Sequence, residues 1–162
     1  MKIFLKDDFL TQEERESVIE YWIEYRKSKF YKWVDSADFI SQSFPLDKII
    51  NFVSQHFDLT SMVGAECWAH IGTRPPGIHV DRDERYFSNT GVLVTPLCSI
   101  VYYADIQNLD GGRLSVGGND IDPITNRLIM FSSGAPHSVE TYTGTRMALL
   151  INPWHYKIQL VD

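Results

Sequence analysis

The spacing of hydrophobic residues along the chain changes close to residue 61. Before that point, apolar side chains recur at the three- and four-residue intervals of helices in two segments. The first helix is predicted to begin at a capping box formed by Thr11 and Glu14 and to run to about Lys29. The second is predicted to follow Pro45, because proline suits the first turn of a helix.

From residue 61 onward, short apolar segments alternate with turn residues, which is typical of strands. We expect strands at Met62–Ile71, Ile78–Asp81, Gly91–Val94, Cys98–Ala104, Gly112–Val116, Asn126–Phe131, Ser138–Thr141, Thr145–Ile151 and His155–Leu160. Two helices followed by these strands predict an α+β fold with a β-sandwich or jelly roll. No repeat or linker interrupts the sequence, so we interpret residues 1–162 as a single domain, with helical support over 1–60 and a jelly-roll core over 61–162.

A histidine and an aspartate separated by one residue, His79 and Asp81, stand in one of these predicted strands. Strand side chains alternate, so both are expected on the same face. His137, from a distant strand, can complete a set of two imidazoles and one carboxylate, which suits Fe(II) and leaves coordination positions open. Arg146, nine residues later, can bind the far carboxylate of a metal-chelating acid. A lone His-X-Asp motif is common by chance, and the four residues together favour a metal site.

Further motifs accompany these four residues. They are the strand, turn and helix from Phe4 to Trp22, the strand Ser99–Tyr103, the glycine pair within Asp110–Leu114 and the strand Asn126–Phe131. In this order and spacing, the chain resembles the 2-oxoglutarate and Fe(II)-dependent oxygenases, specifically the compact prolyl 4-hydroxylase-like branch. The resemblance covers nearly the whole chain and implies a double-stranded β-helix (jelly roll) with the N-terminal helices packed on one sheet.

The resemblance also implies a role for each candidate residue. His79, Asp81 and His137 match the catalytic metal triad, and Arg146 with Tyr103 matches the pair that holds the distal carboxylate of 2-oxoglutarate. Fe(II) is the implied cofactor, 2-oxoglutarate the co-substrate, and ascorbate a supporting reductant. The implied reaction hydroxylates an unactivated C–H bond of a prolyl or other amino-acid residue and releases succinate and CO2. Halogenating relatives lack the carboxylate found here at Asp81, so its presence favours hydroxylation.

Two positions depart from patterns known in this family or its relatives. Ala69 stands where the family usually has a tyrosine, and its neighbours Trp68 and His70 are the candidates to contact the keto-acid end of 2-oxoglutarate. Asn152 stands six residues after Arg146, where nucleic-acid dealkylating relatives usually have a second arginine. By strand alternation Asn152 faces the same interior as Arg146, so we expect it to touch substrate or co-substrate.

Composition narrows the expected partners. The net charge of −6 disfavours a nucleic-acid substrate, which would require a basic surface. No stretch approaches the length of a membrane span, and Asp7 and Asp8 argue against a signal peptide. Cys67 and Cys98 are too few for a disulfide framework, so a reducing, cytoplasmic location is expected. We therefore expect a peptide or amino-acid substrate, without nucleic-acid or membrane partners.

Two other functions stay open on the sequence alone. One is an oxygenase that acts on a free small metabolite, and the other is a non-catalytic, cupin-like metal-binding module. The second function would have no use for a carboxylate-binding pair such as Tyr103 and Arg146. The segment from Asp83 to Pro96 also has two interpretations, a lid over the pocket or a long surface hairpin packed on the sandwich.

Overall fold

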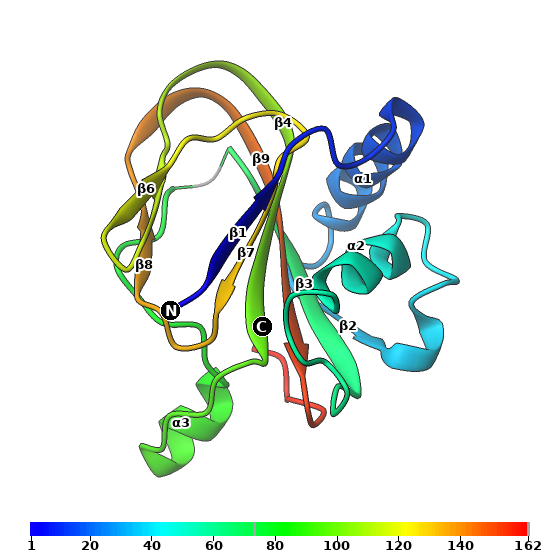
Figure 1. Ribbon diagram of the computed structural model, residues 1–162, viewed down its shortest axis with the longest axis vertical. Coiled ribbons are helices and arrows are strands. Elements are labelled where there is room, and N and C mark those ends of the chain that lie inside the picture. Colours follow the sequence, from blue (N-terminus) through cyan, green and yellow to red (C-terminus); the bar gives the residue numbers. More distant parts are fainter. Residues whose placement is uncertain (73, 162) are drawn as a thin grey trace.

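The core of the molecule is a six-stranded antiparallel sheet that packs against a three-stranded antiparallel sheet (Figure 1). The computed structural model describes residues 1–72 and 74–161. The strand order is β1-β7-β4-β9-β3-β2 in the large sheet and β6-β5-β8 in the small one. The strands are β1 (Ile3–Lys6), β2 (Lys32–Asp35), β3 (Gly64–Ile71), β4 (Cys98–Gly111), β5 (Leu114–Val116), β6 (Asn119–Ile121), β7 (Leu128–Ser132), β8 (His137–Val139) and β9 (Tyr142–Trp154). The helices are α1 (Gln12–Tyr25), α2 (Leu46–Val53) and α3 (Glu84–Thr90), with a 3-10 helix at Ser36–Asp38.

Helices α1 and α2 cover one face of the large sheet, and the small sheet lies over the other (Figure 1). Trp22 of α1 and Ile49 of α2 belong to the same apolar layer as the outer face of the sheet. The predicted α+β class, a jelly roll with helices packed on one sheet, is confirmed. The first 60 residues do more than provide helical support, because β1 and β2 form the two edges of the large sheet. None of the described helices is long and apolar enough to cross a bilayer.

Alternate residues of β3, β4 and β9 face opposite layers. The set that faces the helices is apolar and buried, and it comprises Ala65, Cys67, Ala69, Cys98, Ile100, Tyr102, Ala104, Met147, Leu149 and Ile151. The buried polar residues of these strands all belong to the other set, and they are Glu66, Ser99, Arg146 and Asn152. Side chains on a strand alternate with a period of two, so one backbone presents a hydrophobic face and a chemically active face.

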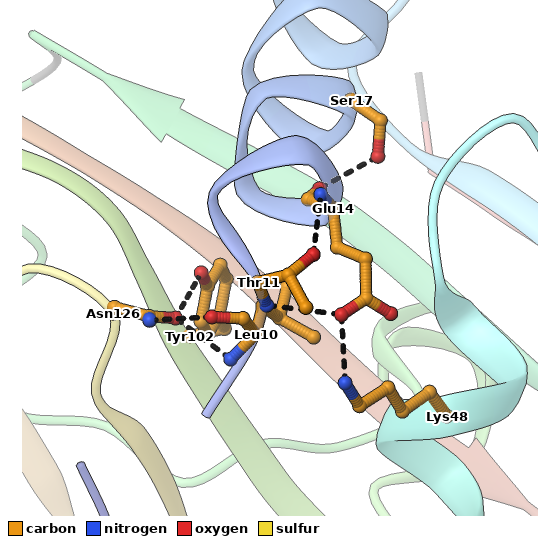
Figure 2. A network of polar contacts seen from close by, with 7 residues as sticks. All are labelled: Leu10, Thr11, Glu14, Ser17, Lys48, Tyr102 and Asn126. Atoms are coloured by element: carbon orange, nitrogen blue, oxygen red, sulfur yellow. Dashed lines mark hydrogen bonds and ion pairs between the residues drawn. The ribbon is translucent and has the colours of Figure 1, made fainter. Parts of the chain in front are cut away.

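A polar network fixes the start of α1 on the sheet (Figure 2). Asn126 adopts the left-handed conformation with φ 66°, and its side chain donates to the carbonyl oxygen of Leu10 at 2.8 Å. Its Oδ1 accepts the backbone N–H of Leu10 at 2.9 Å and the hydroxyl of Tyr102 at 2.7 Å. Lys48 of α2 donates to Glu14 at 2.7 Å. Both helices are therefore tied together next to the strand that carries Tyr103.

The boundaries of α1 agree with the prediction at one end only. The capping box is present, with Thr11 Oγ1 accepting the N–H of Glu14 at 3.2 Å and Glu14 accepting the N–H of Thr11 at 2.9 Å. The helix ends at Tyr25 instead of about Lys29. Beyond it, the chain continues through tighter turns, and the Arg26 guanidinium donates to a carbonyl oxygen of β3 at 3.2 Å. This tertiary contact directs the chain toward β2.

Several strand predictions need correction. Gly91–Val94 and His155–Leu160 contain no strand, and Ile78–Asp81 is reduced to a single bridge residue. Val92 and Leu93 are about half exposed, so their hydrophobicity does not reflect burial on a sheet. The short strands β2 and β6 were not predicted. Both lie at sheet edges, where the pattern of buried residues is weakest.

Candidate active site

The three predicted metal ligands, His79, Asp81 and His137, come together in the structure. Their candidate ligand atoms all lie within 4.8 Å of one another. Asp81 Oδ1 is 3.6 Å from His79 Nε2 and 3.4 Å from His137 Nε2. The backbones of His79 and His137 also form a bridge, in which each N–H donates to the carbonyl oxygen of the other at 2.9 Å. This pairing sets the separation of two imidazoles that are far apart in the sequence.

Hydrogen bonds on the far side of each ligand orient the atoms that face the metal position. Nδ1 of His79 lies 2.7 Å, and Nδ1 of His137 2.9 Å, from the carbonyl oxygen two residues earlier. A carbonyl oxygen only accepts, so each Nδ1 carries the hydrogen in the neutral ring and each Nε2 keeps its lone pair. Ser99 donates to Asp81 Oδ2 at 2.7 Å, which leaves Oδ1 to face the histidines.

The pKa values of His79 and Asp81 depend on each other. Without a bound metal, a proton on Nε2 of His79 would face Asp81 Oδ1, and this contact is the main reason that the pKa of His79 is raised. Burial alone would raise the pKa of Asp81, but the imidazoles of His137 and His79 that face it hold it well below its ordinary value. The carboxylate is therefore ionised although its side chain is only 11% exposed. Two imidazole nitrogens and one carboxylate oxygen on one side of a common point fit Fe(II), with positions left for a chelating co-substrate.

Arg146 is a buried cation on the inward face of β9. It is 3% exposed, and it donates to the Gly112 carbonyl oxygen at 3.2 Å and to the Tyr103 hydroxyl at 3.3 Å. No aspartate or glutamate among the described residues forms an ion pair with it. Burial raises the pKa of Tyr103 and Arg146 opposes this rise, so the phenol is protonated at neutral pH. A buried guanidinium without a carboxylate partner is a site for an anion.

The predicted glycine motif shapes the surroundings of Arg146. Gly111 and Gly112 have φ angles of 82° and 79°, which favour glycine. A Cβ on Gly111 would lie 2.1 Å from the carbonyl oxygen of Thr141, and one on Gly112 would lie 3.3 Å from Arg146 Cδ. A larger residue at either position would push the chain away from the arginine that it supports.

Trp68, His70 and Asn152 line the cavity that joins the triad to Arg146. His70 pairs with Ala148, which in turn pairs with Tyr103, so a small residue separates the histidine from the tyrosine. Burial lowers the pKa of His70 to about 4, and the charge of Arg146 contributes, so His70 is neutral at physiological pH. The structure places these residues where they were expected, and their contacts with a bound co-substrate stay a prediction.

Ala69 faces away from this cavity. It is fully buried in the layer under the helices. A tyrosine at this position would enter that apolar layer, because strand alternation turns every second side chain outward. In this register the cavity positions of β3 are occupied by Trp68 and His70.

Other residues at the site had no role assigned from the sequence. Ser99 holds Asp81, while Glu66 and Tyr31 line a second cavity of about 190 Å³ next to the triad. Continuing the strand alternation from Tyr103 to Ser99, or from His70 to Glu66, would have found two of them. Tyr31 lies immediately before β2, and no local pattern indicates its position.

The segment from Asp83 to Pro96 contains helix α3 and does not form a hairpin, while its role as a lid stays a prediction. Asp83 begins the helix by accepting the N–H of Tyr86 at 2.9 Å, and it also accepts the hydroxyl of Tyr156 at 2.7 Å. Gly91, with φ 72°, ends the helix. An aspartate at the N-cap and a glycine at the C-cap are ordinary signals for the start and end of a helix, but this helix was not predicted from the sequence. Helix α3 projects from the body of the molecule (Figure 1), and of its described residues Glu84 lines the second cavity.

Comparison with known proteins identifies the fold. No protein-family profile and no curated protein matches the sequence. A Pseudomonas putida prolyl-4-hydroxylase is similar in structure over 96% of this chain and 93% of its own, with a TM-score of 0.67 and 20% identity. The fold is that of the prolyl hydroxylases. The viral collagen prolyl hydroxylase of Paramecium Bursaria Chlorella virus-1, in complex with 2-oxoglutarate, is similar over 97% of both chains, with a TM-score of 0.65 and 12% identity.

A third similar structure contains a bound peptide. It is a prolyl hydroxylase in complex with a peptide fragment of the hypoxia inducible factor oxygen degradation domain, from Trichoplax adhaerens. The similarity covers 94% of this chain and 83% of that chain, with a TM-score of 0.61 and 15% identity. At these identities the likeness confirms the predicted fold, and the activity has to be argued from the site.

Proposed function

We propose that this protein is a 2-oxoglutarate- and Fe(II)-dependent dioxygenase that hydroxylates a peptidyl or free amino acid. The observation that carries the proposal is the presence of two complementary sites in one cavity. One is the cluster of His79, Asp81 and His137, and the other is Arg146, buried and without an acidic partner among the described residues. A dicarboxylic keto acid bridges such sites, with one end on the metal and the other on the guanidinium. A metal-binding module without turnover would not need the second site.

The residues of the chain bind and orient the reactants in this proposal. Arg146 and Tyr103 hold the distal carboxylate of 2-oxoglutarate, while Trp68 and neutral His70 line the wall beside its chelating end. Ser99 keeps one oxygen of the metal-binding carboxylate turned away from the metal. When bound, Fe(II) with 2-oxoglutarate and dioxygen supplies the oxidising chemistry that converts a C–H bond to C–OH, and the co-substrate leaves as succinate and CO2.

Proline, within a peptide or as the free amino acid, is the first substrate to test. The similar structures include prolyl hydroxylases, one of them with a bound peptide fragment. A free small metabolite is the alternative substrate within the same chemistry. The acidic net charge of −6 and the presence of Asn152 in place of a second arginine both disfavour nucleic acid.

Succinate formation tests the proposal directly. The purified protein is incubated with Fe(II), 2-oxoglutarate and ascorbate, with and without candidate peptides and amino acids. We expect succinate in proportion to a product whose mass has increased by one oxygen, and no succinate from Asp81→Ala. A parent protein that neither binds 2-oxoglutarate nor forms succinate with any candidate contradicts the proposal.

A further inference from the structure

The second cavity adjoins the triad on the side away from Arg146. On β3, Glu66 pairs with Asn152, which lies six residues along β9 from Arg146. At about 3.3 Å per residue, this places the two positions roughly 20 Å apart along the strand. Trp68 and Asn152 line both cavities, so the second one continues from the metal site. It therefore extends from the metal site away from the end of the first cavity that Arg146 lines.

Glu66 is a buried acid that faces this cavity. It is 8% exposed, and it has no ion-pair partner among the described residues. Burial raises its pKa to about 8, and the charge of Asp81 adds to the rise. The Trp154 side chain partly offsets this rise, although its indole N–H forms no hydrogen bond of ordinary geometry. A negative charge at this position is unfavourable until a cation neutralises it.

Two aromatic rings stand beside this carboxyl group. Tyr31 and Trp68 pack with their ring centroids 5.6 Å apart at an interplanar angle of 58°, and both line the cavity. Aromatic faces attract ammonium and guanidinium groups, most strongly where water is excluded. Arg82, a basic residue of the same wall, pairs with Glu84 at 3.0 Å and lies 3.8 Å over another ring, that of Phe87. Arg82 therefore has partners other than Glu66 and forms no ion pair with it.

The charge balance of the loaded site leaves Glu66 without compensation. A divalent metal and the carboxylate of Asp81 together carry one positive charge, and Arg146 adds a second. Doubly charged 2-oxoglutarate neutralises both. An ionised Glu66 then remains as the uncompensated charge facing the second cavity, and a cationic ligand would neutralise it.

We propose that the substrate carries a cationic nitrogen, either an alkylammonium or a guanidinium, which binds to Glu66 beside Tyr31 and Trp68. The inference rests on the proposed function and deepens it by naming the substrate class. Two sources present this chemistry, the α-ammonium of a free amino acid and the side chain of a basic residue. Glu66 is then a specificity-determining residue, separate from the groups that bind the metal and 2-oxoglutarate.

A panel of matched probes distinguishes the cation from its source. Free L-lysine, L-arginine and L-proline carry an α-ammonium, the N-acetyl amides of lysine and arginine carry only a side-chain cation, and those of norleucine and proline carry none. Binding to the parent protein loaded with both Mn(II) and 2-oxoglutarate is measured by calorimetry, because the charge balance applies to that state. We expect the cationic probes of at least one source to bind at least about tenfold more tightly than the neutral amides. If only the free amino acids bind more tightly, the cation is the α-ammonium. If the capped basic residues also bind more tightly, the cation is that of the side chain.

Variants of Glu66 test whether this residue creates the preference. Glu66→Gln keeps the size of the side chain and removes its charge, so the affinity for cationic probes should fall at least about 30-fold, with little change for neutral ones. Glu66→Asp should retain part of the preference. Glu20→Gln removes the same charge from an exposed position of α1 and should leave the preference unchanged. Circular dichroism and Mn(II) binding establish that each variant is folded.

Three results would overturn the inference. They are neutral probes that bind as tightly as cationic ones, no binding of any cationic probe at millimolar concentration, and an unchanged preference in folded Glu66→Gln. The first two concern the parent protein, so they apply even where a variant fails to fold. The proposed function fails in a different way, when the parent protein does not bind 2-oxoglutarate and forms no succinate. Cation binding is measured without turnover, so the two failures are distinguishable.

Discussion

The two faces of the large sheet are made by alternate residues of the same strands, yet they contain opposite kinds of side chain. Toward the helices, residues such as Leu149 and Tyr102 are fully buried in an apolar layer. Toward the inner cavity, Arg146, Glu66 and Asn152 are almost as deeply buried although they are polar or charged. Burial stabilises the first set and penalises the second unless a ligand or a partner satisfies it. Substitutions on one face should therefore change folding, and those on the other should change binding.

Removal of a metal ligand should have the largest effect. His137→Ala is expected to abolish stoichiometric Fe(II) or Mn(II) binding or to weaken it by at least about tenfold, and the same holds for His79→Ala and Asp81→Ala. Calorimetry with Mn(II) measures this without turnover. Unchanged affinity in all three variants would rule out the cluster as a metal site.

Arg146→Ala should remove 2-oxoglutarate binding while metal binding survives. The distal carboxylate would lose its buried charge partner, which costs about 2–5 kcal/mol of binding free energy. Titration of 2-oxoglutarate into the Mn(II)-loaded variant measures the loss. Arg113→Ala is the matched control, because Arg113 is exposed and pairs with Glu140 at 3.2 Å. If the Arg146 variant binds 2-oxoglutarate as tightly as the parent protein, the assignment is wrong.

Leu149→Ala tests the opposite face of the same strand, three residues from Arg146. Leu149 is fully buried, so the cavity left by its truncation should lower the free energy of unfolding by about 2–5 kcal/mol. Denaturant unfolding measures this change. The folded variant should bind Mn(II) and 2-oxoglutarate as the parent protein does. A loss of ligand affinity comparable to that of Arg146→Ala would mean that the two faces are not independent.

Ser99→Ala should have a smaller effect on the inner face. The serine hydroxyl donates to Asp81 Oδ2 at 2.7 Å, and loss of such a supporting hydrogen bond typically weakens metal binding by about 10- to 100-fold. Ser54→Ala provides a control, because the Ser54 hydroxyl is exposed and donates to a helix carbonyl oxygen at 2.7 Å. Equal Mn(II) affinity in Ser99→Ala and the control would show that Asp81 does not need this support.

Glu66→Gln should have the smallest effect, a change in how the Tm depends on pH. The pKa of Glu66 is about 8 in the folded protein against an ordinary value of 4.5, so between these values the folded state binds more protons than the unfolded state. The contribution of Glu66 to stability therefore falls as the pH rises through this range. The Tm of metal-free Glu66→Gln, relative to the parent protein, should increase between about pH 5 and pH 8. Parallel Tm curves for the two proteins would contradict a raised pKa.

Local sequence patterns predicted those elements that are stabilised locally or fully buried. The capping box of Thr11 and Glu14 and the buried part of β4 are examples. The prediction ended β4 at Ala104, whereas the strand continues to Gly111. Residues such as Gln107 are exposed but still paired with β9, so hydrogen bonding extends the strand beyond the point where its hydrophobic pattern ends.

The candidate metal ligands and Arg146 were predictable because their chemistry is rare in combination and their spacing matches a family pattern. Glu66 and Tyr31 were not predicted. They come from separate strands or loops and share a cavity with Asp81 only after β2 and β9 have paired with β3. Strand alternation from His70 would have placed Glu66 on the inner face, whereas no local pattern indicates the position of Tyr31.

By itself, the sequence determined the period of the strands, the N-terminal cap of α1 and the set of candidate metal ligands, because these depend on residues close together in the chain or on the chemistry of single side chains. Only the tertiary structure decided which face of β3 each residue occupies, that Ala69 turns toward the helices, and that α3 projects from the body. It also decided that Arg146 and Glu66 are buried without an ion-pair partner among the residues that the structure describes. The pairing of distant strands sets the register, and the register decides which buried charges are left for ligands to neutralise.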